Sequence, residues 1–169
     1  MRKFLFILLI ILIGVKTFAQ TGIPKAQAMF IYNFSRLIEW PASYKSGPFI
    51  IGVLGSSDTY TELESFTVGK NVGTQSISVV KFINSADITN CQILFVTFSK
   101  TKELPNILQK LQGKSSLIIT EKNGAIEEGA ALNFCVIGDK LKFEFKPDNA
   151  AKYQLKVSSK LGEMAFKTY

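Results

Sequence analysis

The sequence predicts a single α/β domain with a mainly parallel central sheet, an antiparallel β-hairpin that extends the sheet, and flanking helices. Apolar runs of strand length, at Phe49 to Leu54 and Ile93 to Phe98, are typical of strands buried on both faces of a parallel sheet. Helical segments separate these runs, as connections between parallel strands require. Near the C-terminus the pattern changes to strict alternation about Gly138-Asp139, which is typical of a hairpin.

The first expected element is an amphipathic helix over residues 24–41. Pro24 suits the first helical position, and Pro41 ends the run because the residue before a proline is pushed out of the α region. Apolar side chains recur on one side, as in a helix that packs against a core. They are Ala26, Phe30, Ile31, Phe34, Leu37 and Ile38.

Large side chains also fall on or beside the polar side of this helix. They are Met29, Tyr32 and Trp40, next to Lys25 and Arg36. Met, Tyr, Trp and Arg are enriched at protein–protein interfaces. Two interpretations stay open: a neighbouring loop covers Met29 and Trp40, or Met29, Tyr32, Arg36 and Trp40 form a partner-binding surface.

Strands and helices then alternate, which predicts parallel strands joined by helical connections. In chain order the sequence predicts strands over 49–54, 76–82, 93–98 and 116–120, and helices over 59–66 and 100–111. Gly113 ends the second of these helices. We find no internal repeat or linker that divides the chain, so one domain is expected.

The hairpin is predicted from two alternating segments, 132–137 and 140–146, on either side of Gly138-Asp139. Counting outward from the turn makes one face apolar throughout, whereas a slip by one residue would mix the two faces. The apolar pairs are Val136 with Leu141, Phe134 with Phe143 and Leu132 with Phe145, and the other face pairs Cys135 with Lys142 and Asn133 with Glu144. A helical C-terminus is expected over 147–165, with a break near 157–158.

Residues 1–19 are typical of a cleaved secretory signal peptide. A basic start precedes the apolar run Phe4 to Val15, and small side chains near Ala19 suit a signal peptidase. Twelve apolar residues are too few for a permanent membrane anchor. We therefore expect cleavage after Ala19, export to the periplasm, and one domain over residues 20–169.

The composition excludes several classes of function. The chain has no histidine, which removes the commonest general base and the commonest transition-metal ligand. An enzyme is therefore not expected, and neither a metal nor a cofactor is expected. The formal charge is +7, or +4 once Arg2, Lys3 and Lys16 are removed and seventeen basic residues face thirteen acidic ones. This mild and scattered charge predicts no nucleic-acid partner.

A small anionic ligand is one candidate at the end of the first predicted strand. Gly55, Ser56, Ser57 and Asp58 follow that strand and precede a helix, where backbone N–H groups and the helix dipole attract anions. Lys100 follows the third strand and is expected at the same edge of the sheet. The alternative is that Ser57 or Asp58 caps the helix and Gly55 makes the turn.

The two cysteines, Cys91 and Cys135, are candidate redox residues. They lie far apart in sequence and do not form a metal-binding spacing. Three interpretations stay open for Cys135: a small residue buried under a helix, a disulfide with Cys91, or a reactive thiol. In the third case Lys142 and neighbouring lysines would lower the pKa of the Cys135 thiol.

Several short blocks, in their order along the chain, resemble the YfiR-like family of periplasmic proteins. The blocks are FIYNF at 30–34, EWP at 39–41, FIIGVLG at 49–55 ahead of Asp58, CQILFV at 91–96, and a C-terminal segment from Ala150-Ala151 through VSSKL at 157–161 to Ala165. The resemblance implies an exported, non-enzymatic regulator. Such a regulator binds the periplasmic part of an inner-membrane diguanylate cyclase and holds it inactive until envelope or redox stress releases it.

The resemblance also implies intramolecular disulfides, although members of that kind carry more cysteines than the two of this chain. A second function stays open: a small-ligand sensor, coupled to a histidine kinase or another membrane receptor, that uses the crevice at the strand ends. A homodimer also stays open.

Overall fold

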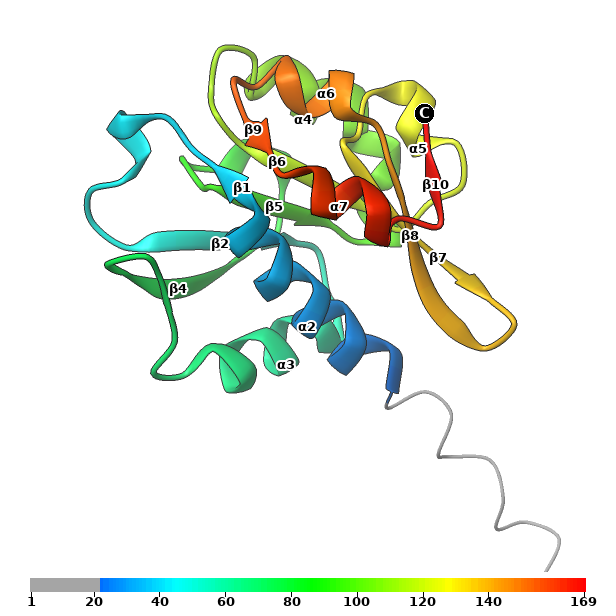
Figure 1. The fold of residues 1–169 in the computed structure, drawn as a ribbon, viewed down its shortest axis with the longest axis horizontal. Coiled ribbons are helices and arrows are strands. Elements are labelled where there is room, and N and C mark those ends of the chain that lie inside the picture. Colours follow the sequence, from blue (N-terminus) through cyan, green and yellow to red (C-terminus); the bar gives the residue numbers. More distant parts are fainter. Residues whose placement is uncertain (1–21) are drawn as a thin grey trace, which may run out of the picture.

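An eight-stranded sheet forms the centre of the domain (Figure 1), and the computed structural model describes residues 22–169. The strands are β2 Phe49–Leu54, β3 Asn71–Val72, β4 Gln75–Phe82, β5 Ile93–Val96, β6 Leu117–Thr120, β7 Leu132–Ile137, β8 Lys140–Phe145 and β10 Lys167–Thr168. Their order across the sheet is β10-β8-β7-β6-β5-β2-β4-β3. The strands from β4 to β7 in that order run parallel, while β7–β8 and β3–β4 are antiparallel pairs. The predicted signal peptide lies outside the described residues.

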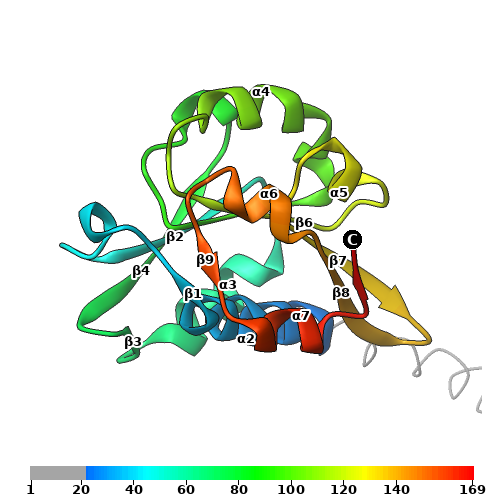
Figure 2. The ribbon, with the colours of Figure 1, turned by 45° about the horizontal axis from the view of Figure 1, so that its top comes forward.

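Helices cover both faces of this sheet. They are α2 Gly22–Leu37, α3 Asp58–Thr67, α4 Leu104–Lys110, α5 Ala125–Glu128, α6 Pro147–Ala151 and α7 Ser159–Met164, and 3₁₀ turns lie at Ala42–Tyr44, Ser85–Asp87 and Phe98–Glu103. Figure 2 shows α2 and α7 on one side of the sheet and α4 and α5 on the other. Among residues 22–169, no helix has the length and apolar character needed to cross a bilayer. The predicted α/β class, with a parallel sheet and an added hairpin, is confirmed.

The first helix ends earlier than its sequence predicts. α2 ends at Leu37, and Ile38–Glu39 forms strand β1, which pairs antiparallel with strand β9, Lys156–Val157. The backbone N–H of Ser158 also donates to Leu37 O at 2.9 Å. The predicted end at residue 41 is therefore wrong, because a distant segment offers backbone partners that compete with the last helical turn.

The hairpin register is confirmed. Every predicted pair between β7 and β8 occurs, for example Val136 opposite Leu141. Gly138 and Asp139 have φ angles of 52° and 61°. Both turn residues therefore adopt the left-handed conformation of a type I′ turn, whose twist matches that of the flanking strands.

Aromatic rings join α2 to the sheet. Between ring centroids, Phe34 of α2 lies 4.8 Å from Phe143 and 6.1 Å from Phe134. Phe95 of β5 lies 6.0 Å from Phe134, and all four side chains are buried. Because burial of one such side chain contributes about 1.5–3 kcal/mol, this cluster fixes α2 on the face formed by β5, β7 and β8.

The C-terminal segment is only partly helical. α6 and α7 occur where a broken helix is expected, but β9 lies between them and β10 follows them. β10 pairs with β8, with Lys167 opposite Glu144. The last residues therefore protect an edge of the sheet that the hairpin would otherwise leave open.

Candidate functional site

The predicted partner-binding residues do not share one surface. Met29 is 44% exposed, Arg36 is exposed and Tyr32 is half-buried, and all three belong to α2. Trp40, in contrast, is only 5% exposed. The structure therefore leaves three of the four predicted side chains where a partner can reach them.

Trp40 lies in the core, so its predicted place on an exposed contact surface is wrong. Its ring packs edge-on against Phe49, with 5.0 Å between the ring centroids. Its indole Nε1 donates a hydrogen bond to the backbone oxygen of Gln92 at 3.2 Å. The cause is the early end of α2. Because Trp40 follows β1 rather than a helical turn, the helical spacing that placed it beside Arg36 does not apply.

A second helix completes the exposed side of α2. Phe66 of α3 lies 5.7 Å from Tyr32 between ring centroids, with 74° between the ring planes. The Lys70 ammonium lies 3.6 Å from the centroid of the Phe66 ring, and the Arg36 guanidinium lies 5.9 Å from that of Tyr32. Each such cation–π contact contributes about 0.5–1 kcal/mol at an exposed site. We name Met29, Tyr32, Arg36, Phe66 and Lys70 the α2–α3 surface.

Two members of the α2–α3 surface, Phe66 and Lys70, are not predicted from the sequence. Phe66 ends a predicted helix and Lys70 starts a predicted loop. The periodicity of α3 shows which of its residues share a side, but it does not show that this side meets Tyr32.

The corner predicted to bind an anion lies at the carboxyl ends of β2 and β5. Strand order reverses there, since β4 lies on one side of β2 and β5 on the other, and ligands commonly bind at such a point. Ser57 Oγ accepts the backbone N–H of Thr59 at 3.1 Å, which confirms the capping alternative. Lys100 forms an ion pair with Glu103 at 3.0 Å.

A carboxylate of the protein occupies the same edge of the sheet. Glu121 Oε1 accepts the backbone N–H of Phe98, in the first turn after β5, at 2.8 Å. Glu121 Oε2 accepts the Gln27 amide at 2.7 Å, and Gln27 Oε1 accepts the Thr59 hydroxyl at 2.5 Å. An N–H group that an anion would seek is therefore already bonded within the protein. A ligand at residues 55–58 stays a prediction.

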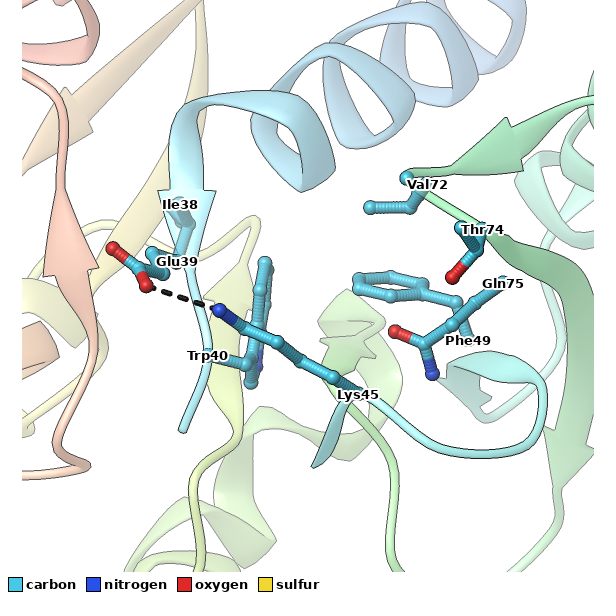
Figure 3. Close-up of a pocket in the computed structure, with 9 residues that line it drawn as sticks. Ile38, Glu39, Trp40, Lys45, Phe49, Val72, Thr74 and Gln75 are labelled. Atoms are coloured by element: carbon cyan, nitrogen blue, oxygen red, sulfur yellow. Dashed lines mark hydrogen bonds and ion pairs between the residues drawn. The ribbon is translucent and has the colours of Figure 1, made fainter. Parts of the chain in front are cut away.

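A cavity of about 390 Å³ opens beside Trp40, between β1 and the β3–β4 turn (Figure 3). Trp40, Phe49 and Val72 contribute apolar walls. Lys45 and Glu39, both exposed, form an ion pair at 3.0 Å, and the hydrogen bond from Lys45 lowers the pKa of the Glu39 carboxyl. Such a cavity suits a small molecule with an apolar part and a charged group. Its walls come from three separate segments, which is why no sequence motif predicts it.

The two cysteines are free, and one copy of this fold does not bring them together. Phe95, Ile119 and Leu132 lie level across β5, β6 and β7. Cys135 lies three residues beyond that level and Cys91 four residues before it, so they are roughly 23 Å apart along the strands at about 3.3 Å per residue. A disulfide requires Cα atoms within about 7 Å. The predicted alternative of a bond between Cys91 and Cys135 is therefore wrong within one chain.

Neither thiol has the lowered pKa of a reactive cysteine. Burial raises the pKa of the Cys91 thiol to about 12. The pKa of the half-buried Cys135 thiol is also raised. Burial is the larger cause, and the nearby Glu144 carboxylate adds to it. The expected lowering by Lys142 is wrong, because desolvation disfavours the thiolate and the Glu144 carboxylate, on the neighbouring strand β8, repels it.

Groups that bind metals are sparse in the described part of the chain. Among residues 22–169, no three Cys, Asp or Glu side chains gather closely enough to hold a metal ion. The α2–α3 surface and the cavity beside Trp40 are two features of these residues that do offer binding groups.

Comparison with known proteins bears on both the fold and the family. The structure of "the ABC domain in complex with L-Trp" from Streptococcus pneumoniae superposes with a TM-score of 0.57 at 11% sequence identity, covering 86% of this chain and 60% of that one. This likeness shows the fold alone, and the chain spans 60% of the length of that protein chain. No curated protein matches the chain. The sequence pattern of the YfiR/HmsC-like family matches residues 24–165, and the chain therefore belongs to the YfiR/HmsC-like family.

Proposed function

We propose that this protein is a periplasmic regulator that binds the periplasmic part of an inner-membrane diguanylate cyclase and holds the cyclase inactive. Family membership supports the proposal, because YfiR-like proteins are periplasmic regulators that act with membrane signalling partners. The basic start and apolar run of residues 2–15 are in keeping with export.

The α2–α3 surface is the contact site that we assign to this function. It combines an exposed methionine, two aromatic rings and two cations, which is the composition of a binding hot spot. Within the described residues, neither Arg36 nor Lys70 forms an ion pair. Arg36 therefore keeps its charge for acidic groups of a partner. The Lys70 ammonium, which donates to the backbone oxygen of Phe66, adds positive charge beside it. This favours a cyclase domain with an acidic and apolar docking patch.

Deletion of the gene is expected to raise cellular cyclic di-GMP, because the cyclase loses its inhibitor. Re-expression of the parent protein should lower cyclic di-GMP again, and the variant Tyr32→Ala, Arg36→Ala should fail to do so. Truncation of hot-spot side chains costs 2 kcal/mol or more of binding energy, which corresponds to roughly a thirtyfold loss of affinity. Extraction and quantification of cyclic di-GMP measures the effect.

A second tyrosine and cation pair provides the matched control. Lys167 Nζ lies 3.9 Å from the centroid of the Tyr169 ring, outside the α2–α3 surface. The variant Tyr169→Ala, Lys167→Ala should therefore restore low cyclic di-GMP. Unchanged cyclic di-GMP after deletion would contradict the proposed function, whereas full complementation by the Tyr32, Arg36 variant would contradict only the surface.

The cavity beside Trp40 favours a second candidate function, a small-ligand sensor coupled to a histidine kinase or another membrane receptor. The similar Streptococcus pneumoniae structure holds L-Trp, and an aromatic zwitterion has groups that suit Phe49, Glu39 and Lys45. Isothermal titration with L-tryptophan should give heat. Lys45→Ala should weaken binding about tenfold, since a hydrogen bond to a charged group contributes about 1.5 kcal/mol. Lys160→Ala, on α7, is the control, and absence of heat with the parent protein excludes this ligand.

A further inference from the structure

The end of the β7–β8 hairpin projects past the rest of the sheet (Figure 1). Thr120, the last residue of β6, lies opposite Asn133, so the remainder of β7 continues beyond the carboxyl end of its neighbour. We name residues 136–142 the hairpin tip. We propose that the hairpin tip rests on the surface of a membrane that contains anionic phospholipids.

The hairpin tip exposes apolar side chains on both of its faces. Val136 is 54% exposed and Ile137 is 45% exposed. Because neighbouring residues of a strand point to opposite faces, these two side chains lie on opposite sides of a two-stranded ribbon. A flat protein surface would cover one side and leave the other in water, whereas a lipid interface surrounds both. The two-sided exposure therefore favours lipid over a protein partner.

The charge of the hairpin tip complements an anionic membrane. Lys140 and Lys142 are exposed, and neither forms an ion pair with a described residue. Asp139 is the one acidic residue of the tip. Each lysine near an anionic leaflet contributes about fivefold in affinity. The long lysine stem also lets the ammonium stay among the headgroups while its apolar neighbours enter the lipid.

The start of the domain lies at the same end of the molecule. Figures 1 and 2 both show the first turn of α2 at the end from which the hairpin projects. Phe30 of α2 packs on Phe143, with 5.5 Å between centroids, one apolar pair below the tip. The first helix therefore supports the base of the hairpin, at the end of the domain that we place against the membrane.

This lipid contact does not use the α2–α3 surface. It would hold the domain close to the membrane in which the proposed partner lies, and so raise the effective concentration of each for the other. An experiment can therefore disprove the lipid contact of the hairpin tip without disproving the partner contact of the α2–α3 surface, and the reverse.

Co-sedimentation with vesicles tests the proposal on protein purified from the periplasm after export. Vesicles of phosphatidylethanolamine and phosphatidylglycerol should bind the protein, and vesicles of phosphatidylcholine alone should bind it far less. The variant Val136→Ser, Ile137→Ser should bind about tenfold more weakly, because half-exposed aliphatic side chains no longer leave water. The variant Lys140→Gln, Lys142→Gln should bind about twentyfold more weakly at low salt.

Val68→Ser is the matched control, because Val68 is 80% exposed at the far end of α3. It should leave vesicle binding unchanged, and all variants should keep the melting temperature of the parent. Equal binding to both kinds of vesicle, or an equal loss in Val68→Ser, overturns the proposal. So does a Val136, Ile137 variant that binds vesicles normally but fails to lower cyclic di-GMP, since the tip would then contact a protein. Normal cyclic di-GMP control without vesicle binding overturns the lipid contact and leaves the proposed function standing.

Discussion

Replacement of Trp40 by alanine is expected to lower the free energy of unfolding by about 3–5 kcal/mol. The indole is buried against Phe49, and its N–H is bonded to the backbone oxygen of Gln92. Alanine therefore leaves a cavity and removes a buried hydrogen bond. Denaturant unfolding followed by circular dichroism measures the loss, and the midpoint should fall without a large change in slope.

Gln92, whose backbone oxygen accepts the Trp40 N–H, also holds the segment before β2 through its side chain. Gln92 Oε1 accepts the Ile50 N–H at 2.8 Å, and Gln92 Nε2 donates to the backbone oxygen of Tyr44 at 3.0 Å. Trp40→Phe is the matched control because it keeps an aromatic ring and loses the indole N–H. It should cost about 1–2 kcal/mol. If Trp40→Ala were as stable as the parent, the ring would not be buried and could again belong to a contact surface.

The sheet and the hairpin are predictable from the sequence because local periodicity specifies them. The apolar run 49–54 coincides with strand β2, and a single register keeps Phe134 and Phe143 on one face. The end of α2 is not predictable in this way. β9, which is distant along the chain, decides that Ile38 leaves the helix. Helical propensity is a weak preference that tertiary pairing overrides.

The candidate site is less predictable than the fold. Helical spacing alone places Tyr32 and Arg36 on one side of α2. Phe66 and Lys70 join them only because α3 packs along α2. Glu121 follows β6 as an ordinary turn residue in the sequence, yet its carboxylate occupies the edge where an anion is predicted. A protein carboxylate that lies where a ligand is expected produces no local pattern in the sequence.

Replacement of Gly55 by alanine is expected to cost about 2–4 kcal/mol of folding free energy. Gly55 has a φ angle of +101°, which side chains rarely tolerate, and an added Cβ would lie 2.3 Å from Thr97 Oγ1. The Thr97 hydroxyl donates to the Leu54 oxygen at 2.9 Å, so it cannot move aside without losing that bond. Denaturant unfolding of the purified variant measures the cost.

Gly73→Ala separates backbone strain from close approach. Gly73 also has a positive φ angle, of +58°, but an added Cβ there meets nothing within 4 Å. Its replacement should cost about 1 kcal/mol, which is the backbone contribution alone. The difference between the two variants then contains the cost of the contacts that the added Cβ makes with Thr97 and Lys100, together with the greater backbone strain at +101°.

A double-mutant cycle with Thr97→Ala tests whether that contact is the reason for glycine at the strand-end corner. Without the Thr97 hydroxyl, Gly55→Ala should cost about 1 kcal/mol less than it does in the parent. Additive costs would show that Thr97 is not responsible. A coupled result explains Gly55 through packing between β2 and the turn after β5. A Gly55→Ala protein as stable as the parent would remove that explanation and favour the predicted ligand at residues 55–58.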